Sequence, residues 1–232
     1  ERAYAQIDGN GQENMALCCD FLAWRLSLCT SFTPRESFEQ RRETLLQQHN
    51  VAWLNILQSS CAYYYALLGL PEKIPAVFRE HQLASIHFLA PGKPMMELIE
   101  NQVYLAQGEY AKVIGHSEAL LGMCEAMHYA LVALHIRLQT ASAYEALGNR
   151  AMARKLLVRA LEDAQPDGFV LPFAENAPYL MNHYSALSRE LETPFAAAVC
   201  EASGQWLSRK ETSGAPCELP EALRELSERE RS

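Results

Sequence analysis

The sequence predicts an all-α protein in which about five helix pairs stack into a right-handed superhelix. Between the glycines and prolines, apolar residues recur at intervals of three and four, which is the helical period. Strict alternation, the period of a strand, is not evident, and β-branched residues are sparse. A Tyr–Gly element also recurs with its glycines 39 and 40 residues apart, which indicates a structural repeat.

The Tyr–Gly element occurs at Tyr65–Gly69, Tyr104–Gly108 and Tyr144–Gly148, and in each copy the tyrosine precedes the glycine by four residues. We expect the tyrosine to lie one turn before a helix end and to pack against the next helix. The glycine then occupies the tight turn, where it adopts a positive φ without steric cost. A second amphipathic helix is expected to run back after each turn.

The second helices are predicted from apolar stripes. The clearest follows Gly148, where small alanines allow a close helix approach; its members are Ala153, Leu156, Leu157, Ala160, Leu161 and Ala164. The copy after Gly108 continues with Tyr110, Val113, Ile114, Leu120 and Leu121. The copy after Gly69 continues with Ile74, Val77, Phe78 and Ile86, with Pro71 suited to a first helical turn.

The outer copies lack the Tyr–Gly pair, as end repeats often do. Counting one period back predicts a helix over 13–29, a turn over 31–34 and a second helix to about residue 49. Counting one period forward predicts a helix over 177–190 and another that ends near residue 208. We therefore divide the chain into a helical-repeat domain, 1–208, and a polar linker with a charged end, 209–232.

Composition limits the function. The net charge of −8 disfavours binding of this chain to nucleic acid or anionic membranes. No apolar run reaches the ~18 residues of a membrane span. The seven cysteines form no C-x-x-C pair and several lie in apolar segments, so we expect reduced thiols in the cytoplasm. Motifs for phosphate loops, zinc proteases and nucleophilic serines are absent, and we expect no catalytic or metal site.

The copy around Gly148 resembles a tetratricopeptide repeat, through residues at the spacing of that family: Ala141, Tyr144, Gly148, Ala153, Leu157 and Ala160. The longer period of about 40 is similar to the helical-repeat sensor region of MalT-like, large ATP-binding LuxR-type transcription activators. Similar to that family's last repeat are Ala160, Leu161, Ala164, Pro166, Gly168, Phe169, Pro172 and Phe173. The segment 226–231, Leu-Ser-Glu-Arg-Glu-Arg, looks like the entry to a LuxR-type helix-turn-helix.

The resemblance implies a bacterial regulator with further modules beyond this chain. An N-terminal module would bind ATP, and a C-terminal module would bind DNA, so that this chain contacts DNA only through the latter. The repeat region itself would receive a small-molecule inducer or a protein partner and pass the signal on, with no cofactor of its own. Self-association remains a possibility that the sequence leaves open.

Aligning the repeat turns places certain residues on the inner side of the superhelix, where a concave groove is expected. This mixture of polar side chains and two aromatic rings suits a polar, sugar-like ligand. The candidate residues are Asp20, Trp24, Ser59, Tyr63, Gln102, His135, Gln139, Ser142, Glu145 and Asn182. The alternative interpretation is that these residues only solvate the groove, with Trp24 and Tyr63 in the core.

The sequence gives less support to two other functions. A peptide-binding scaffold of tetratricopeptide type would need Lys or Arg in the groove to clamp a peptide carboxylate, and the candidate set contains neither. An enzyme on an α-solenoid is supported only by the presence of histidines and carboxylates.

Overall fold

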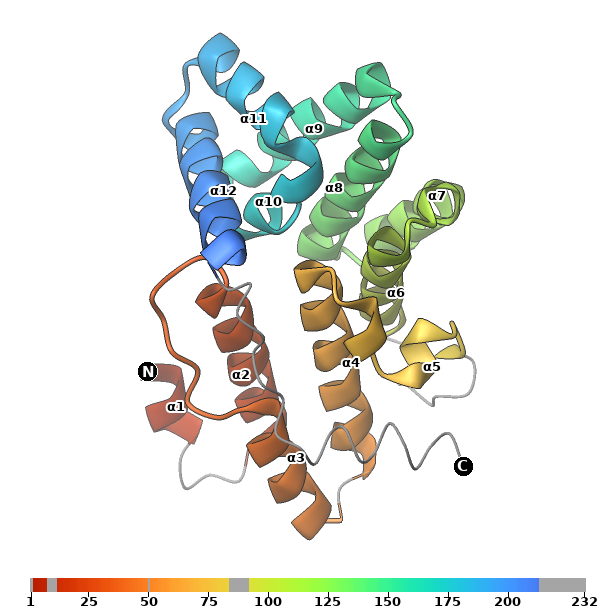
Figure 1. The fold of residues 1–232 in the computed structure, drawn as a ribbon, viewed down its shortest axis with the longest axis vertical. Coiled ribbons are helices and arrows are strands. Elements are labelled where there is room, and N and C mark those ends of the chain that lie inside the picture. The colour runs from red at the N-terminus through yellow and green to blue at the C-terminus, as the bar shows by residue number, and fades with distance from the viewer. Residues whose placement is uncertain (1, 8–11, 50, 84–91, 213–232) are drawn as a thin grey trace.

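The computed structural model describes residues 2–7, 12–49, 51–83 and 92–212, and every regular element in these ranges is a helix (Figure 1). The predicted all-α class is therefore confirmed. In chain order the elements are α1 (Arg2–Ile7), α2 (Glu13–Ser27), α3 (Phe38–Gln47), α4 (Val51–Leu68), η1 (Pro71–Lys73), α5 (Ala76–Arg79), α6 (Lys93–Gln107), α7 (Tyr110–Ala126), α8 (Ala130–Ala146), α9 (Arg150–Ala164), η4 (Gln165–Asp167), α10 (Leu171–Glu175), α11 (Ala177–Leu191) and α12 (Pro194–Thr212).

The Tyr–Gly spacing has a direct cause in backbone hydrogen bonding. Gly69, Gly108 and Gly148 have φ of 71°, 78° and 79°, so each ends its helix in the left-handed conformation. The amide that follows each glycine donates back to the tyrosine carbonyl, at 3.0, 2.9 and 2.8 Å respectively. This six-residue closure places the left-handed residue four positions after the tyrosine, with three residues between them. The predicted turn is thus present in all three copies.

Replacing Gly148 with alanine should lower the free energy of unfolding by about 1–2 kcal/mol, because a Cβ is disfavoured at positive φ. Gly122, in the interior of α7, provides a control because the space where its Cβ would lie is open and its φ is not positive. Gly122→Ala should raise stability by up to about 1 kcal/mol through helix propensity. Urea unfolding measures both changes, and a neutral Gly148→Ala would contradict the conformational argument.

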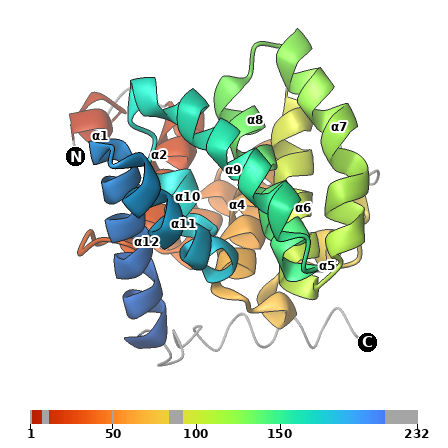
Figure 2. The ribbon, with the colours of Figure 1, turned by 90° about the horizontal axis from the view of Figure 1, so that it is seen from above.

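The first helices of successive copies pack on one another in order: α2 on α4, α4 on α6, α6 on α8, and α8 on α11. The second helices of the copies lie beside this row: α3 packs on α4, α5 packs on α6, and both α7 and α9 pack on α8. The chain then returns through α10 and α12, so that α12 lies above the end of α2 (Figure 1). Seen from above, α12 and α7 lie on opposite sides of the molecule (Figure 2).

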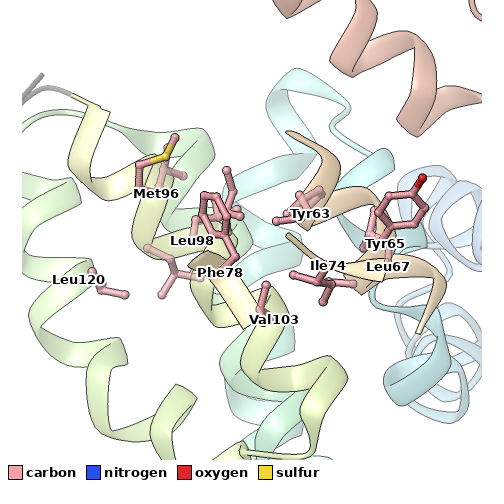
Figure 3. Packing of buried hydrophobic residues seen from close by; sticks show 14 of the residues in the cluster. Tyr63, Tyr65, Leu67, Ile74, Phe78, Met96, Leu98, Val103 and Leu120 are labelled. Carbon is pink, nitrogen blue, oxygen red and sulfur yellow. The ribbon is translucent and has the colours of Figure 1, made fainter. Parts of the chain in front are cut away.

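The largest apolar cluster crosses these copies. Figure 3 shows its members from α4, α5, α6 and α7, with Phe78 beside Leu98 and Val103. Cys29, just beyond α2, and Trp206 of α12 belong to the same cluster, which joins the two ends of the described chain. A second cluster fills the space between α8, α9 and α11, where Ala141 and Ala160 are completely buried and permit close helix contact.

Several local expectations differ from the structure. The second helix of the copy at Gly69 is only η1 and the four residues of α5, because Pro75 lacks the amide hydrogen that a continuous helix needs. Ile86 lies outside the described residues. Two helices were not predicted, α1 and α10. Helix α12 continues to Thr212, so the first four residues of the expected linker are helical, and 213–232 lies outside the described residues.

The described residues bear on two further expectations, one about membrane-spanning helices and one about cysteine thiols. No helix among them is both long and apolar enough to cross a membrane. Their cysteines are free thiols.

Candidate functional site

The predicted groove residues are mostly buried. Eight of the ten have little exposure: Asp20, Trp24, Ser59, Tyr63, Gln102, His135, Gln139 and Ser142. Glu145 is half-buried and Asn182 is exposed. The eight buried side chains pack within the fold instead of lining an open groove. For Trp24 and Tyr63, this is what the alternative interpretation expected. Ligand binding by any of the ten stays a prediction.

The most concentrated polar group in the interior combines two predicted residues, Tyr63 and His135, with Arg25 and Glu175. Arg25 Nε and Nη2 donate to the two oxygens of Glu175, at 2.6 and 2.9 Å. The Tyr63 hydroxyl donates to Glu175 Oε2 at 2.8 Å. The Glu175 side chain is 0% exposed and that of Arg25 14%, so this is a buried ion pair. We call these four residues the central network.

Four helices supply the central network, namely α2, α4, α8 and α10, whose ends meet at the centre of Figure 1. Glu175 is the last residue of the short α10, which packs on α8 and α12. Arg25 and Glu175 are 150 residues apart in the chain. The guanidinium also lies over the rings of Phe21 and Tyr63, at 5.3 and 5.4 Å from their centroids. The network therefore joins the first helix pair to the last part of the fold.

His135 completes the network as a neutral side chain. Arg25 Nη2 lies 3.3 Å from His135 Nε2, and because guanidinium nitrogens only donate, Nε2 must accept. The proton is then on Nδ1, which lies 3.3 Å from the Tyr63 hydroxyl oxygen. Burial, and next the positive charge of Arg25, lower the pKa of His135 to about 4. Burial and the charge of Glu175 raise the pKa of Tyr63 well above its usual value, so it remains a donor.

The lowered pKa of His135 predicts a pH-dependent stability. The pKa is about 6.5 in the unfolded chain and about 4 in the folded one, so between these values the unfolded state binds more protons. The contribution is present above pH 6.5 and is lost as the pH falls toward 4, by about 2–3 kcal/mol. Urea unfolding at several pH values should show a flatter profile for His135→Gln; identical profiles would contradict the assignment.

A second buried ion pair lies at the middle of α2. Arg41 Nε donates to Asp20 Oδ2 at 2.6 Å, and the Tyr4 hydroxyl donates to Asp20 Oδ1 at 2.6 Å. Glu13 and Glu36 add contacts to Arg41 at 3.3 and 3.2 Å. Since this group ties α1, α2 and α3 together, it serves the packing of the first helix pair.

Apart from the exposed Asn182, the remaining candidates form two short bridges and three isolated contacts. Gln139 Nε2 donates to Gln102 Oε1 and to the Leu98 carbonyl, both at 3.0 Å, which connects α8 to α6. Ser142 lies 3.1 Å from Asn176 Oδ1, which connects α8 to the start of α11. The isolated contacts are Ser59 with the Ile56 carbonyl, Trp24 with the Glu36 carbonyl, and Glu145 with His183.

Sequence reasoning missed Arg25, Glu175, Arg41 and Asn176. A usable signal existed for the first two, because each is a single charged residue within an apolar stretch, Trp-Arg-Leu and Phe-Ala-Glu. A charge in such a position is buried only when it is paired. The partner could not be identified, since 150 residues separate Arg25 from Glu175.

A hollow of about 670 Å³ lies between the turn after α2 and the end of α12. Residues 29–31 line one side, and Gly204, Gln205, Ser208 and Arg209 line the other. It is largely open to solvent, so it is a surface depression and not an enclosed pocket. Apolar and polar surface contribute almost equally to its lining, which includes hydroxyl groups and one guanidinium.

The charged and titratable groups of the central network are engaged with one another. Glu175 is held by Arg25 as an ion pair, and the lowered pKa of His135 makes it a poor base at neutral pH. In the part of the chain that the structure describes, no group of three His, Cys, Asp or Glu residues is placed to hold a metal ion.

Comparison with family models, with curated proteins and with solved structures finds no significant match to the chain.

Proposed function

We propose that residues 1–208 form the effector-sensing helical-repeat region of a LuxR-family transcription regulator, and that its helix pairs form a right-handed superhelix. The all-α fold, the three Tyr–Gly turns and the row of first helices from α2 to α11 support the superhelix. The Leu226–Arg231 sequence, which resembles the entry to a LuxR-type DNA-binding module, supports the regulator.

The observation that carries the sensing role is the central network. It places a buried ion pair where the first helix pair meets α10, so the two ends of the repeat region are held by a few strong, geometrically specific contacts. Such pairs are strongly dependent on geometry, because an incorrectly placed partner leaves a buried charge uncompensated. A ligand that favours the closed or the open arrangement of these ends would shift the population between the two.

In this proposal, the signal leaves the repeat region through α12 and the segment that follows it. Helix α12 packs on α10, which carries Glu175, and on α11. A change at the central network therefore has a short path to the last described helix. DNA binding and ATP binding belong to flanking modules, and the protein acts in the cytoplasm, where its thiols stay reduced.

The 232-residue chain tests this division of labour. Thermal unfolding with a panel of sugars, sugar phosphates, nucleotides and amino acids should identify a compound that raises the Tm in a saturable manner. A mobility-shift experiment with duplex DNA at physiological salt should show no complex. A shift of DNA by this chain alone would contradict the proposal, and recovery of a specific peptide from a display library would favour the peptide-binding scaffold.

A further inference from the structure

Helix α5 ends at a histidine whose backbone adopts a conformation that favours glycine. His81 has a φ of 57°. The amide of Gln82 donates to the Val77 carbonyl at 2.8 Å, so this turn closes in the same way as the Tyr–Gly turns. A side chain is strained at such a φ, and the strain persists only where the surrounding structure compensates for it. The contacts of the imidazole ring must therefore hold this turn in place.

Two of those contacts fix the His81 ring on α6. The ring stacks on that of Tyr104, with centroids 4.1 Å apart and an angle of 16° between the planes. His81 Nε2 lies 2.7 Å from Gln107 Oε1. Gln107 Nε2 donates to the Arg79 carbonyl at 2.9 Å, which leaves Oε1 as the amide atom that faces the ring. Because that oxygen only accepts, His81 Nε2 carries a proton and donates the hydrogen bond.

The third contact joins the other ring nitrogen to a carboxyl group. His81 Nδ1 is buried and lies 3.4 Å from Glu100 Oε1. The two side chains are 20% and 11% exposed, so water has little access to the space between these atoms. If neither atom held a proton, a nitrogen lone pair would face a negatively charged oxygen, which is costly away from water. One proton removes this cost, as an imidazolium beside a carboxylate or as an imidazole beside a carboxylic acid.

The surrounding charges act on this shared proton. Burial, and next the negative charge of Glu97, raise the pKa of the Glu100 carboxyl, whereas His81 and His116 act in the opposite direction. Burial and the charge of Glu100 also raise the pKa of Tyr104 to about 12, so its hydroxyl stays neutral. The raised pKa of Glu100 means that the folded pair retains a proton at a pH where an exposed carboxyl would lose it.

Most charged groups on the other elements that pack on α6 have partners of their own. Helix α4 carries no Asp, Glu, Lys or Arg, and η1 carries the exposed Glu72 and the half-buried Lys73. On α8, His135 belongs to the central network, and Arg137 and Glu145 pair with α9 and α11. The pairs on the remaining elements are Arg79 with Glu80 and Lys112 with Glu109.

We propose that His81 and Glu100 form a pH-sensitive switch, which holds the turn after α5 on α6 while the pair retains one proton and releases the turn when that proton passes to water. Release from the deprotonated pair is favourable because it hydrates both atoms and relieves the strain at His81. Phe78 is completely buried in the apolar cluster beside Leu98 (Figure 3), so α5 stays anchored and the movement is confined to the turn.

The direction of the pH effect follows from the raised pKa of Glu100. This pKa lies above the ordinary value of 4.5, so above that pH the folded chain binds more protons than the unfolded chain. The contribution of the pair to stability is therefore complete at low pH and is lost as the pH rises. The sign is opposite to that of His135, whose contribution is lost as the pH falls. The switch does not depend on the proposed sensing role.

Hydrogen exchange of the Gln82 amide, followed by NMR in the 232-residue chain between pH 6 and pH 8.5, measures opening of the turn. We expect its protection factor, which is corrected for the direct effect of pH on exchange, to fall about tenfold or more over this range. The internal control is the Tyr129 amide, which donates to the Cys124 carbonyl at 2.9 Å in the turn formed by His128. His128 has the same φ of 57° but is exposed, so the protection factor of Tyr129 should not change.

Two variants on α6 separate the shared proton from packing. In Glu100→Gln, the new amide nitrogen can donate to His81 Nδ1 at every pH, so Gln82 should stay protected throughout the range. Glu97→Gln keeps the pair and removes a charge that raises the pKa of Glu100. In that variant the loss of protection should remain and shift to lower pH.

A protection factor of Gln82 that is independent of pH in the wild type would overturn the switch. A loss of protection that persists in Glu100→Gln, or that Tyr129 shares, would do the same, because the opening would then not involve this pair. The nitrogen chemical shifts of the His81 ring give a separate check in the wild type. The neutral ring should be protonated at Nε2, and protonation at Nδ1 instead would contradict the assigned contact with Gln107.

Discussion

Replacing Arg25 with methionine is expected to lower the free energy of unfolding by about 3–5 kcal/mol, among the largest effects of any single substitution in this chain. Glu175 is completely buried, and its carboxylate accepts two hydrogen bonds from Arg25 and one from Tyr63. Without the guanidinium, the folded state must hold an uncompensated charge or bind a proton. Either alternative costs stability at neutral pH. Equilibrium unfolding in urea at pH 7 measures the loss.

The double variant Arg25→Met, Glu175→Met distinguishes the pair from the volume it fills. Replacing a buried ion pair by apolar residues of similar size is often neutral or stabilising. We therefore expect the double variant to recover most of the stability lost by Arg25→Met. If the double variant is as unstable as the sum of the two single variants, the two side chains do not interact and the central network does not hold the ends together.

The double variant also tests the role of the ion pair in regulation. A double variant that folds well but no longer changes with effector would show that the pair transmits the signal and is not needed only for folding. Hydrogen exchange in α2 and α10, with and without a bound effector, provides this readout. In the wild type, we expect an effector to alter protection in both helices together, since Arg25 and Glu175 connect them.

Features that depend on neighbouring residues were predictable from the sequence. The Tyr–Gly turns follow from one local rule, in which the amide after a left-handed glycine returns to a carbonyl five residues earlier. The bounds of α11 and the apolar stripe of α9 were predictable in the same way, because the helical period marks the stripe and Pro and Gly mark where a helix begins or ends. Where a local signal was overlooked, as with Pro75, a long helix was expected and only α5 is present.

The candidate site was predictable only in part, because it depends on how distant segments meet. Helical phase placed Tyr63 and His135 on the inner face, and both lie in the central network. Nothing in the phase of a single helix shows that Arg25 faces Glu175, so the interior was expected to be an open groove. Most of its polar residues instead bond to one another or to backbone carbonyls, which is how buried polar groups avoid the cost of desolvation.

A second large effect is expected at Trp206, the most voluminous completely buried side chain, which is 1% exposed. It anchors α12 in the apolar cluster that includes Cys29, Ala62 and Ile136. Trp206→Ala removes the ring and leaves a cavity, so the free energy of unfolding should fall by about 3–5 kcal/mol. Phe169→Ala, at a ring that is 40% exposed, should change stability by less than about 0.5 kcal/mol.

Loss of Trp206 should also act locally, since the ring packs α12 into the apolar cluster that contains Cys29. The Cys29 thiol is 8% exposed and that of Cys124, in α7, is 1% exposed, so both should react slowly with maleimide in the wild type. In Trp206→Ala, labelling measured by mass spectrometry in native buffer should accelerate at Cys29 and remain slow at Cys124, because the lost contact concerns α12. Equal acceleration at both thiols would mean that the whole fold opens and that α12 has no separate role in closing the repeat region.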